Sequence, residues 1–505
     1  MDLPRKNRLS PLCLVFPWLI FSGLLVQAQP GPEKTCSFDP QPWLQDFAQL
    51  ISEMSAHYAN LEYAVEDRHM DLPALRREAE TKLRASCSEN EAKLALKMFL
   101  DHFGDGHLEI DWAKSPAETK EAKQPGATSL CERLGYEKRT FKPGIYFSEL
   151  PQFNSLGGEG ADWFPGGILR VNEAVQFGVI RIAIFSEHWF PEVCRQVVGE
   201  MHLAGADNCD DNCENKVEIE SGNRLTVAVE KRVAQLEAAG ATNILVDVTQ
   251  NGGGSDWIDP VVRTLSSAAL RESTFGFIKH EHWTKELQDR LAEVEADLKQ
   301  ADSKQADATN HNQQREVLQD AATRLRQGVS LSQEKCDRNN VWNDGKFSCS
   351  LVVRGLFYVS GALPYAEPGS FPTLQSRTVL FHPLLYRYKE SPARPPLSVI
   401  VDRQTWSSAE YFATILQDNG AAKILGEVTG GAGCGYTNGG IPTTLNNSHA
   451  QVKMPDCIRF RKDGTNENAG VTPDVLVPWS AHDSAYIKAQ KLFLALSATL
   501  AGAKR

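Results

Sequence analysis

Three apolar runs, each followed by a polar or glycine-rich turn, constrain the fold of this chain most strongly. They are "FGVIRIAIF" (177–185), the start of "TNILVDVTQNGGGSD" (242–256) and "PLSVIVD" (396–402). Short apolar runs bounded by turn residues are typical of buried strands. Helical patterns lie between them, over about 188–203 and 221–239. This alternation of strands and helices predicts an α/β core.

The third run leads directly into two serines and the start of a helix. Ser407 and Ser408 stand at that junction, and Glu410 follows three positions after Ser407. One interpretation is structural, because Ser at an N-cap and Glu three residues later form a capping box. The other is catalytic, because a serine at a helix start lies beside free backbone amides that can stabilise an oxyanion.

Three further stretches supply the remaining groups that a serine nucleophile requires. His107 lies in "GDGHLEI", Gly252 and Gly253 lie in "NGGG", and Glu467 lies in "NENAGVTPD". A histidine can accept the serine proton, an acid can orient the histidine, and backbone amides can bind the oxyanion. Triads are defined by geometry and not by chain order, so the order His, Gly, Ser, Glu is compatible with catalysis.

Each of these stretches also has a purely structural interpretation. A single histidine after a helix is usually an ordinary polar residue, and "NGGG" can be a tight turn. The turn lacks the Lys-Ser/Thr of a P-loop and the spacing of a dinucleotide fingerprint. No Cys or His group has zinc-binding spacing. We therefore expect neither a cofactor nor a metal.

The chain resembles the carboxyl-terminal-processing, or tail-specific, serine peptidases, within the branch similar to the tricorn core. "VIRIAIF", "ILVDVTQNGGG", "SVIVDRQTWSSAE", "LQDNGAAKILGEVTGG" and "ENAGVTPDVLVP" occur in the family's order. The resemblance implies a crotonase-like ββα-type core in which Ser407 is the nucleophile, His107 the base and Glu467 the orienting acid. It also implies an oxyanion hole formed by the amides of Gly252 or Gly253 with Ser408.

Two features depart from that family. Members with a Ser-Lys dyad carry the lysine at a position that Ala432 occupies here, in "TGGAGCG". About 70 residues separate "GDGH" from the 177–185 strand, which is too few for a full PDZ domain. We therefore expect a Ser/His/Glu enzyme without a full PDZ domain for the selection of C-terminal tails.

The first 28 residues have the features of an export signal. "RKNR" is positive, the apolar run that follows has about 15 residues, and "VQA" supplies small residues for cleavage. That run is shorter than the ~20 residues that span a bilayer. The ten cysteines after residue 28 agree with an exported, disulfide-bonded protein that is periplasmic or extracellular. Plausible pairs are Cys36 with Cys87, Cys209 with Cys213, Cys336 with Cys349, and Cys434 with Cys457, although sequence does not fix connectivity.

The length of 505 residues allows two or three domains, and the net charge of −11 argues against a nucleic-acid partner. Residues 281–328 form an inserted helical hairpin with a solvated outer face, or else a partner-binding arm. The expected division is a signal peptide 1–28, a helical unit 36–103, a small strand region 104–176, core segments 177–280 and 351–480, an insertion 281–350, and a C-terminal helix 481–505.

These observations favour an exported serine endopeptidase that cleaves protein or peptide substrates through an acyl-enzyme. We expect no membrane-spanning segment after cleavage of the signal. The sequence is compatible with a monomer or a homo-oligomer. The alternative is a non-catalytic protein on the same fold that binds lipids or peptides. A small-ester hydrolase ranks last, because the chain has no G-x-S-x-G elbow.

Overall fold

The computed structural model describes residues 36–112, 129–203, 209–303, 308–391, 393–437 and 440–502. The proposed export signal lies outside these residues. Within these ranges no helix combines the length and apolar character needed to cross a membrane.

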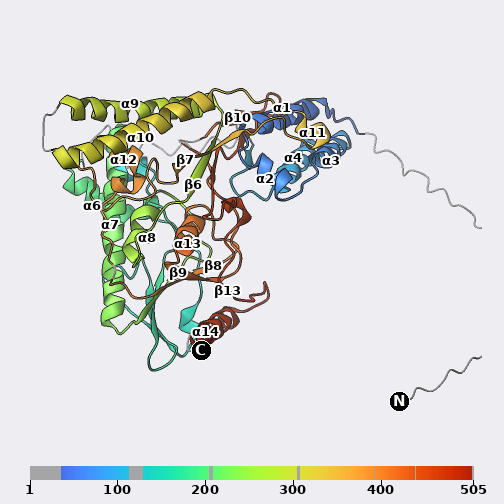
Figure 1. Ribbon diagram of the computed structural model, residues 1–505. Coiled ribbons are helices and arrows are strands. Elements are labelled where there is room, and N and C mark those ends of the chain that lie inside the picture. Colours follow the sequence, from blue (N-terminus) through green and yellow to red (C-terminus); the bar gives the residue numbers. More distant parts are fainter. Residues whose placement is uncertain are drawn as a thin grey trace, which may run out of the picture.

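A seven-stranded sheet forms the centre of the molecule (Figure 1). Its strands, in spatial order, are β13 (Val475–Leu476), β9 (Ala422–Gly426), β8 (Leu397–Val401), β5 (Asn243–Asp247), β4 (Gln176–Arg181), β3 (Gly166–Arg170) and β2 (Phe153–Ser155). The strands from β13 to β4 are parallel, whereas β3 and β2 extend the edge antiparallel. The three apolar runs of the sequence are β4, β5 and β8, so the predicted α/β class is confirmed.

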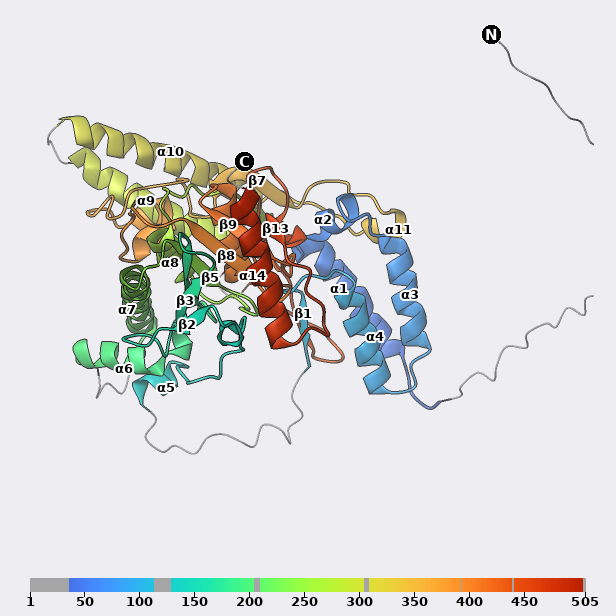
Figure 2. The ribbon, with the colours of Figure 1, turned by 90° about the horizontal axis from the view of Figure 1, so that it is seen from below.

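Helices cover both faces of this sheet, because successive residues of its buried strands point to opposite sides. Val246 and Val399 pack with the helices α7 (Asp211–Ala238), α8 (Ile258–Leu265) and α13 (Ser408–Asp418). Leu245 and Ile400 pack on the other side with α14 (Ala485–Gly502). Figure 2 shows α14 on the side of the sheet away from α7.

Two helices differ from their predicted bounds. The helix expected over 221–239 begins at Asp211, because Asp210 caps it by accepting from the Cys213 amide at 2.9 Å. The acidic residues from Asp211 to Glu220 therefore form the first turns of α7. The helix expected over 188–203 is shorter, since α6 runs from Pro191 to Glu200 after a short 3₁₀ turn.

A helical unit near the N-terminus packs on a small sheet. It comprises α1 (Gln41–His57), α2 (Leu61–Glu66), α3 (Leu72–Arg84) and α4 (Glu89–Asp101), with α11 (Val341–Asp344) and the strands β1 (Glu109–Asp111), β11 (Gln451–Lys453) and β10 (Thr443–Thr444). This unit brings the turn after α4 to the edge of the core.

The inserted segment is a helical hairpin, as expected, and its inner side is buried. Its helices α9 (Glu281–Ser303) and α10 (Ala308–Ser332) pack on a second small sheet of β12 (Cys457–Arg459), β6 (Thr274–Ile278) and β7 (Val352–Tyr358). Figure 1 shows the hairpin across one end of the molecule. The short helices α5 (Leu130–Arg133) and α12 (Arg377–Leu380) complete the α-helices and strands of the described residues.

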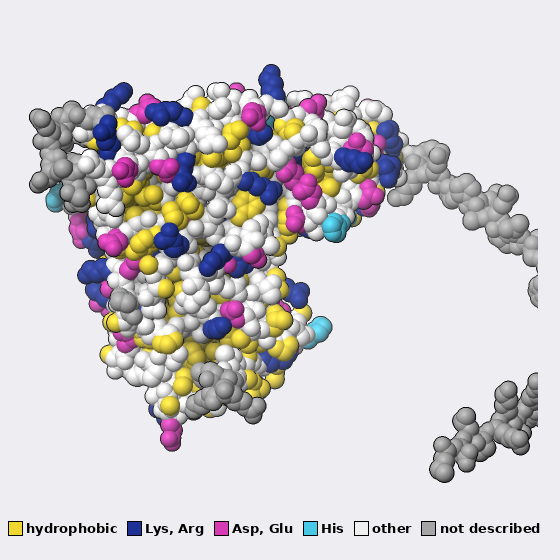
Figure 3. All heavy atoms as spheres, in the orientation of Figure 1, with side chains coloured by type: hydrophobic (Ala, Val, Ile, Leu, Met, Phe, Trp, Pro, Cys, Tyr) yellow, Lys and Arg dark blue, Asp and Glu magenta, His cyan; other side chains and the backbone are white. Residues whose placement is uncertain are grey.

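The described residues contain five disulfides. The four pairs proposed from the sequence are all present, and the fifth joins Cys131 to Cys194. Figure 3 shows basic and acidic side chains interspersed over the face it presents, without a field of one sign.

Candidate active site

Ser407 lies in a tight turn between β8 and α13. It adopts φ 54° and ψ −121°, a conformation that non-glycine residues rarely adopt and that is concentrated at functional sites. The turn is fixed to the end of β5, because Thr405 Oγ1 donates to the Val248 carbonyl at 3.1 Å and the Trp406 amide donates to Asn251 O at 3.0 Å. The strain at Ser407 is therefore held by its neighbours.

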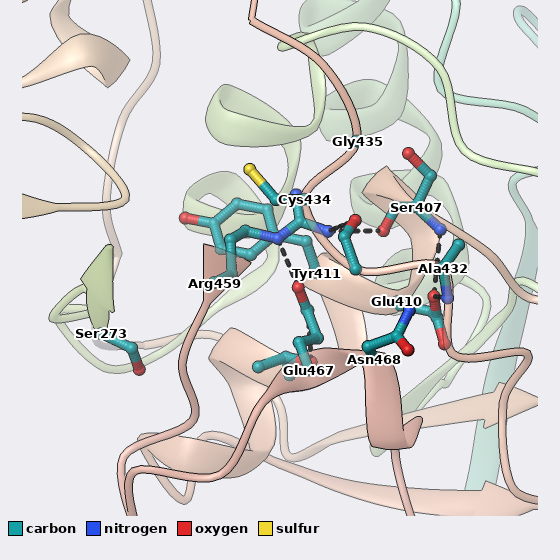
Figure 4. A network of polar contacts seen from close by, with 12 residues as sticks. Ser273, Ser407, Glu410, Tyr411, Ala432, Cys434, Gly435, Arg459, Glu467 and Asn468 are labelled. Atoms are coloured by element: carbon teal, nitrogen blue, oxygen red, sulfur yellow. Dashed lines mark hydrogen bonds and ion pairs between the residues drawn. The ribbon is translucent and has the colours of Figure 1, made fainter. Parts of the chain in front are cut away.

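The two serines of the junction have different surroundings. The Ser408 hydroxyl donates to the Gly254 carbonyl at 3.1 Å, so it has a structural role. The Ser407 amide donates to Glu410 at 3.2 Å, which is part of the expected capping box. Figure 4 shows the Ser407 hydroxyl pointing away from the carboxylates of Glu410 and Glu467. Capping by Glu410 and a serine hydroxyl that points away from both carboxylates therefore coexist at this junction.

The glycine turn packs directly against this junction. A Cβ on Gly253 would lie 2.7 Å from Ser407 Cβ and 2.9 Å from Ser408 N, so a side chain is excluded there. The Gly253 amide donates to Asn251 Oδ1 at 2.8 Å. Among the described residues nothing accepts a hydrogen bond from the amides of Gly252 or Ser408. Two of the three predicted oxyanion donors are thus available, whereas that of Gly253 is occupied.

His107 reaches the site from the helical unit. Its amide donates to Asp105 at 3.0 Å, and this buried carboxylate also accepts from Tyr58 and Asn60. Burial raises the pKa of Asp105. The His107 Nδ1 atom donates to the Ala432 carbonyl at 2.7 Å. The ring is therefore fixed by a carbonyl at the position where the Ser-Lys members of the family carry a lysine.

Glu410 connects the histidine to the serine. Its Oε2 atom accepts from the amides of Ala432 and Ser407 at 2.7 and 3.2 Å, while Oε1 accepts from Thr429 and Gly431. Burial, and secondly the nearby Glu467 carboxylate, raise the pKa of Glu410 to about 7. A chain of hydrogen bonds thus runs from His107 through Ala432 and Glu410 to Ser407. No direct hydrogen bond between His107 and Ser407 occurs in the described ranges.

Glu467 is held by Thr414 and Arg459. It begins a short 3₁₀ helix, Glu467–Ala469, and its buried carboxylate accepts from Thr414 at 2.8 Å and pairs with Arg459 (Figure 4). Thr414 donates to Oε1 and Arg459 pairs with Oε2, so both carboxylate oxygens have partners. The expected contact of Glu467 with His107 is therefore absent from this part of the chain.

Arg459 was not singled out from the sequence, yet it reaches the nucleophile turn. Its Nη2 atom donates to the carbonyls of Ser407 at 3.3 Å and Gly433 at 2.6 Å. Its guanidinium also lies 5.0 Å from the Tyr411 ring centroid. Arg459 ends the short strand β12, eight residues before Glu467. This charged residue in a strand is the sequence signal that could have indicated its pairing with Glu467.

One group of side chains in the described ranges could hold a metal ion. Glu187, His188 and Glu218, here called the Glu187 cluster, place ligand atoms within 4.8 Å of one another. Burial raises the pKa of Glu187 to about 8, although Ser255 donates to its carboxylate. The grouping joins a 3₁₀ turn to α7, so no local sequence pattern reveals it. The cluster includes none of the residues around Ser407.

Comparisons with known proteins identify the family and the fold of this chain. The family model described as peptidase family S41 matches residues 215–477. The structure of mature CPAF complexed with lactacystin superposes with a TM-score of 0.55 at 15% identity, over 92% of this chain and 98% of that one. A crystal structure of mature CPAF gives 0.53 at 15% identity, over 92% and 97%. At 15% identity, the structural similarity to these proteins shows a shared fold and does not by itself assign an activity.

Two curated relatives match a short segment. An uncharacterized protein of Chlamydia muridarum (strain MoPn / Nigg) is 33% identical over 91 residues, which is 18% of this chain and 15% of that protein. A protein of Chlamydia trachomatis serovar D is 32% identical over 92 residues, again 18% and 15%. The alignments thus span less than a fifth of those relatives.

The family match supports a serine-type peptidase, and the enzyme class expected from the sequence is confirmed at this level. The chain belongs to peptidase family S41.

Proposed function

We propose that this protein is an exported serine endopeptidase in which Ser407 attacks the scissile carbonyl and His107 accepts its proton. The observation that carries this proposal is the hydrogen-bond chain from His107 through Ala432 and Glu410 to Ser407. This chain of hydrogen bonds connects the helical unit to the strand–helix junction. It supports our proposal that the two motifs, which are distant in the sequence, act as one site.

The tautomer of His107 follows from its carbonyl partner. A carbonyl oxygen accepts hydrogen bonds and cannot donate, so the neutral ring carries its hydrogen on Nδ1. The lone pair is then on Nε2, which takes the proton of Ser407 during attack and returns it to the leaving amine. Catalytic contacts are often long without substrate and tighten in the complex, which is compatible with the absent Ser407–His107 hydrogen bond.

The oxyanion of the tetrahedral intermediate would bind at the amides of Gly252 and Ser408. Both amides lack an internal acceptor within the described residues, and Ser408 begins α13, where the helix dipole favours negative charge. The amide of Gly253 already donates to Asn251 and serves the shape of the turn.

Glu467 completes the arrangement through Arg459. The buried carboxylate holds the guanidinium, which in turn holds the carbonyls of Ser407 and Gly433. Glu467 is therefore a positioning residue for the nucleophile turn in this proposal, in place of the direct contact with His107 expected for a Ser/His/Glu triad.

Export is supported by two observations. Residues 1–28 have the three regions of a cleavable signal, and all ten later cysteines pair in the structure. Disulfides of this number are typical of oxidising compartments.

The proposal is tested by hydrolysis of an unbiased library of internally quenched peptides. Wild type and Ser408→Ala should cleave the same peptides, although Ser408→Ala loses its hydrogen bond to Gly254. Ser407→Ala and His107→Ala should each lose at least about 10³-fold in kcat/KM while keeping the circular dichroism spectrum of the wild type. Cleavage by Ser407→Ala at the wild-type rate would overturn the assignment.

A further inference from the structure

A cavity of about 310 Å³ opens beside the proposed catalytic residues. It lies between the start of α13, the segment after the glycine turn, the 434–437 loop and the helical hairpin. The residues that matter for its chemistry are Ser408, Tyr436, Trp283, Arg290, His382 and Arg459. The hairpin thus forms a wall of this cavity through α9.

Two lining residues connect the cavity to the reacting groups. Ser408 directly follows Ser407, and its amide is one of the proposed oxyanion donors. The Tyr436 hydroxyl donates to the His107 carbonyl, and the two rings lie 5.5 Å apart. A substrate residue next to the scissile bond would therefore enter this cavity.

Most charges that line the cavity are already compensated. Arg459 pairs with Glu467. The Asp259 carboxylate lies 3.3 Å from Arg263 and 3.2 Å from His382, so it has two basic partners.

The remaining acid is also paired. Asp256 lies 3.6 Å from the other nitrogen of His382. The two aspartates raise the pKa of His382 to about 9 although burial opposes them, so the imidazolium is charged at neutral pH. Both carboxylates that line the cavity, those of Asp256 and Asp259, therefore have basic partners within the protein.

Arg290 is the exception. Its guanidinium lies 5.9 Å from the Trp283 ring centroid, and it forms no hydrogen bond or ion pair with any described residue. Burial lowers the pKa of Arg290, although Glu286 and Glu293 on the same helix act in the opposite direction. Neither of those acids comes within ion-pair distance. A half-buried cation without an acceptor is unfavourable unless an anion joins it.

We propose that Arg290 binds a carboxylate of the peptide substrate in this cavity, so that the enzyme prefers cleavage beside an acidic group. This inference rests on the proposed peptidase function. It assigns a role to the inserted hairpin, because α9 delivers both Arg290 and Trp283. A planar guanidinium can bind a carboxylate through two parallel hydrogen bonds, which gives selectivity as well as affinity. The carboxylate can belong to a side chain or to the C-terminus of the peptide.

The test is a matched series of quenched peptides. One position beside the cleaved bond carries glutamate, glutamine or lysine, and each peptide has an amidated C-terminus. A second arm uses the glutamine peptide with a free C-terminal carboxylate. The variants are Arg290→Gln, Arg290→Glu and the control Arg326→Gln, which removes an exposed hairpin arginine that pairs with Glu295 at 2.7 Å.

Wild type and the control should favour a peptide with a carboxylate over the neutral peptide by about 10- to 100-fold in kcat/KM. Preference for the internal glutamate or for the free C-terminus identifies the source of the carboxylate. Arg290→Gln should abolish the preference for the carboxylate, and Arg290→Glu should favour lysine. A preference that survives in Arg290→Gln would overturn the inference, as would equal rates on all peptides in wild type.

A binding measurement separates this inference from the proposed function. Ser407→Ala, with and without Arg290→Gln, is titrated with the fluorescent glutamate and free-carboxylate peptides in an anisotropy assay. Tight binding that requires Arg290, in a wild type that cleaves nothing, would retain the inference and refute the peptidase. Cleavage or binding that is indifferent to Arg290 would refute the inference and retain the peptidase.

Discussion

Replacement of Glu410 by Gln should displace the backbone around the active site, because the amides of Ser407 and Ala432 would lose their acceptor. The carboxylate accepts four hydrogen bonds, from the amides of Ser407, Gly431 and Ala432 and from the Thr429 hydroxyl. Glutamine keeps one oxygen, and its NH₂ group would face the amides of Ser407 and Ala432. Each buried donor left without an acceptor costs about 1–3 kcal/mol. Because Ala432 holds His107, misplacement of this carbonyl should lower kcat/KM by about 100-fold.

The same change should remove a pH dependence of stability. The folded pKa of Glu410 is about 7, above its unfolded value of 4.5. The folded protein therefore holds this proton more tightly, and its contribution to stability is complete below pH 4.5 and falls as the pH rises to 7. The shift corresponds to roughly 3 kcal/mol of unfolding free energy. The variant lacks this fall, so its deficit relative to wild type should be larger at pH 4.5 than at pH 8.

The assay is urea unfolding followed by tryptophan fluorescence at several pH values between 4.5 and 8. Other buried acids titrate in both proteins, so the difference between the two proteins isolates Glu410. Glu427→Gln is the matched control, because Glu427 lies in the same loop region and faces Arg403, which is 81% exposed, at 3.7 Å. A difference between wild type and Glu410→Gln that stays constant over this range would refute the reasoning.

Three further predictions concern other parts of the structure. Arg459→Gln should lower the free energy of unfolding by about 3–5 kcal/mol, because it leaves the buried Glu467 without its cation; chemical denaturation measures this, and a loss below about 1 kcal/mol would contradict the ion pair. Joint replacement of Cys434 and Cys457 by serine should destabilise the protein by about 3 kcal/mol through the 23-residue separation that the disulfide closes, and an unchanged melting temperature in calorimetry would argue against it. Peptide hydrolysis should survive EDTA, since the Glu187 cluster includes no residue of the proposed mechanism; activity lost in EDTA and restored by zinc or calcium would contradict this.

Much of the fold could be predicted from local sequence. The strands β4, β5 and β8 are continuous apolar runs, since both faces of a central parallel strand are covered. The strand–helix junction at Ser407 and the glycine turn are also local features, because strain and close backbone approach select particular residues. The start of α7 was mispredicted because an acidic N-terminal turn has the composition of a loop.

The details of the site depend on contacts between distant segments. The bond of His107 to the Ala432 carbonyl joins residues 325 positions apart and involves a backbone atom, which composition does not reveal. The pairing of Arg459 with Glu467 was likewise hidden, since the motif suggested an acid but not its partner. The cavity wall formed by Arg290 depends on how the hairpin packs on β6 and β7, and helical periodicity alone predicts a hairpin without its docking.

The central claim is that Ser407 is an activated nucleophile, and covalent labelling tests it most directly. The purified protein is treated with a fluorophosphonate probe beside Ser407→Ala and Ser408→Ala, and the modified peptide is identified by mass spectrometry. The account predicts labelling of wild type and Ser408→Ala at Ser407, and none of Ser407→Ala. Labelling of Ser407→Ala at the wild-type level, or labelling of wild type at another serine, would contradict it.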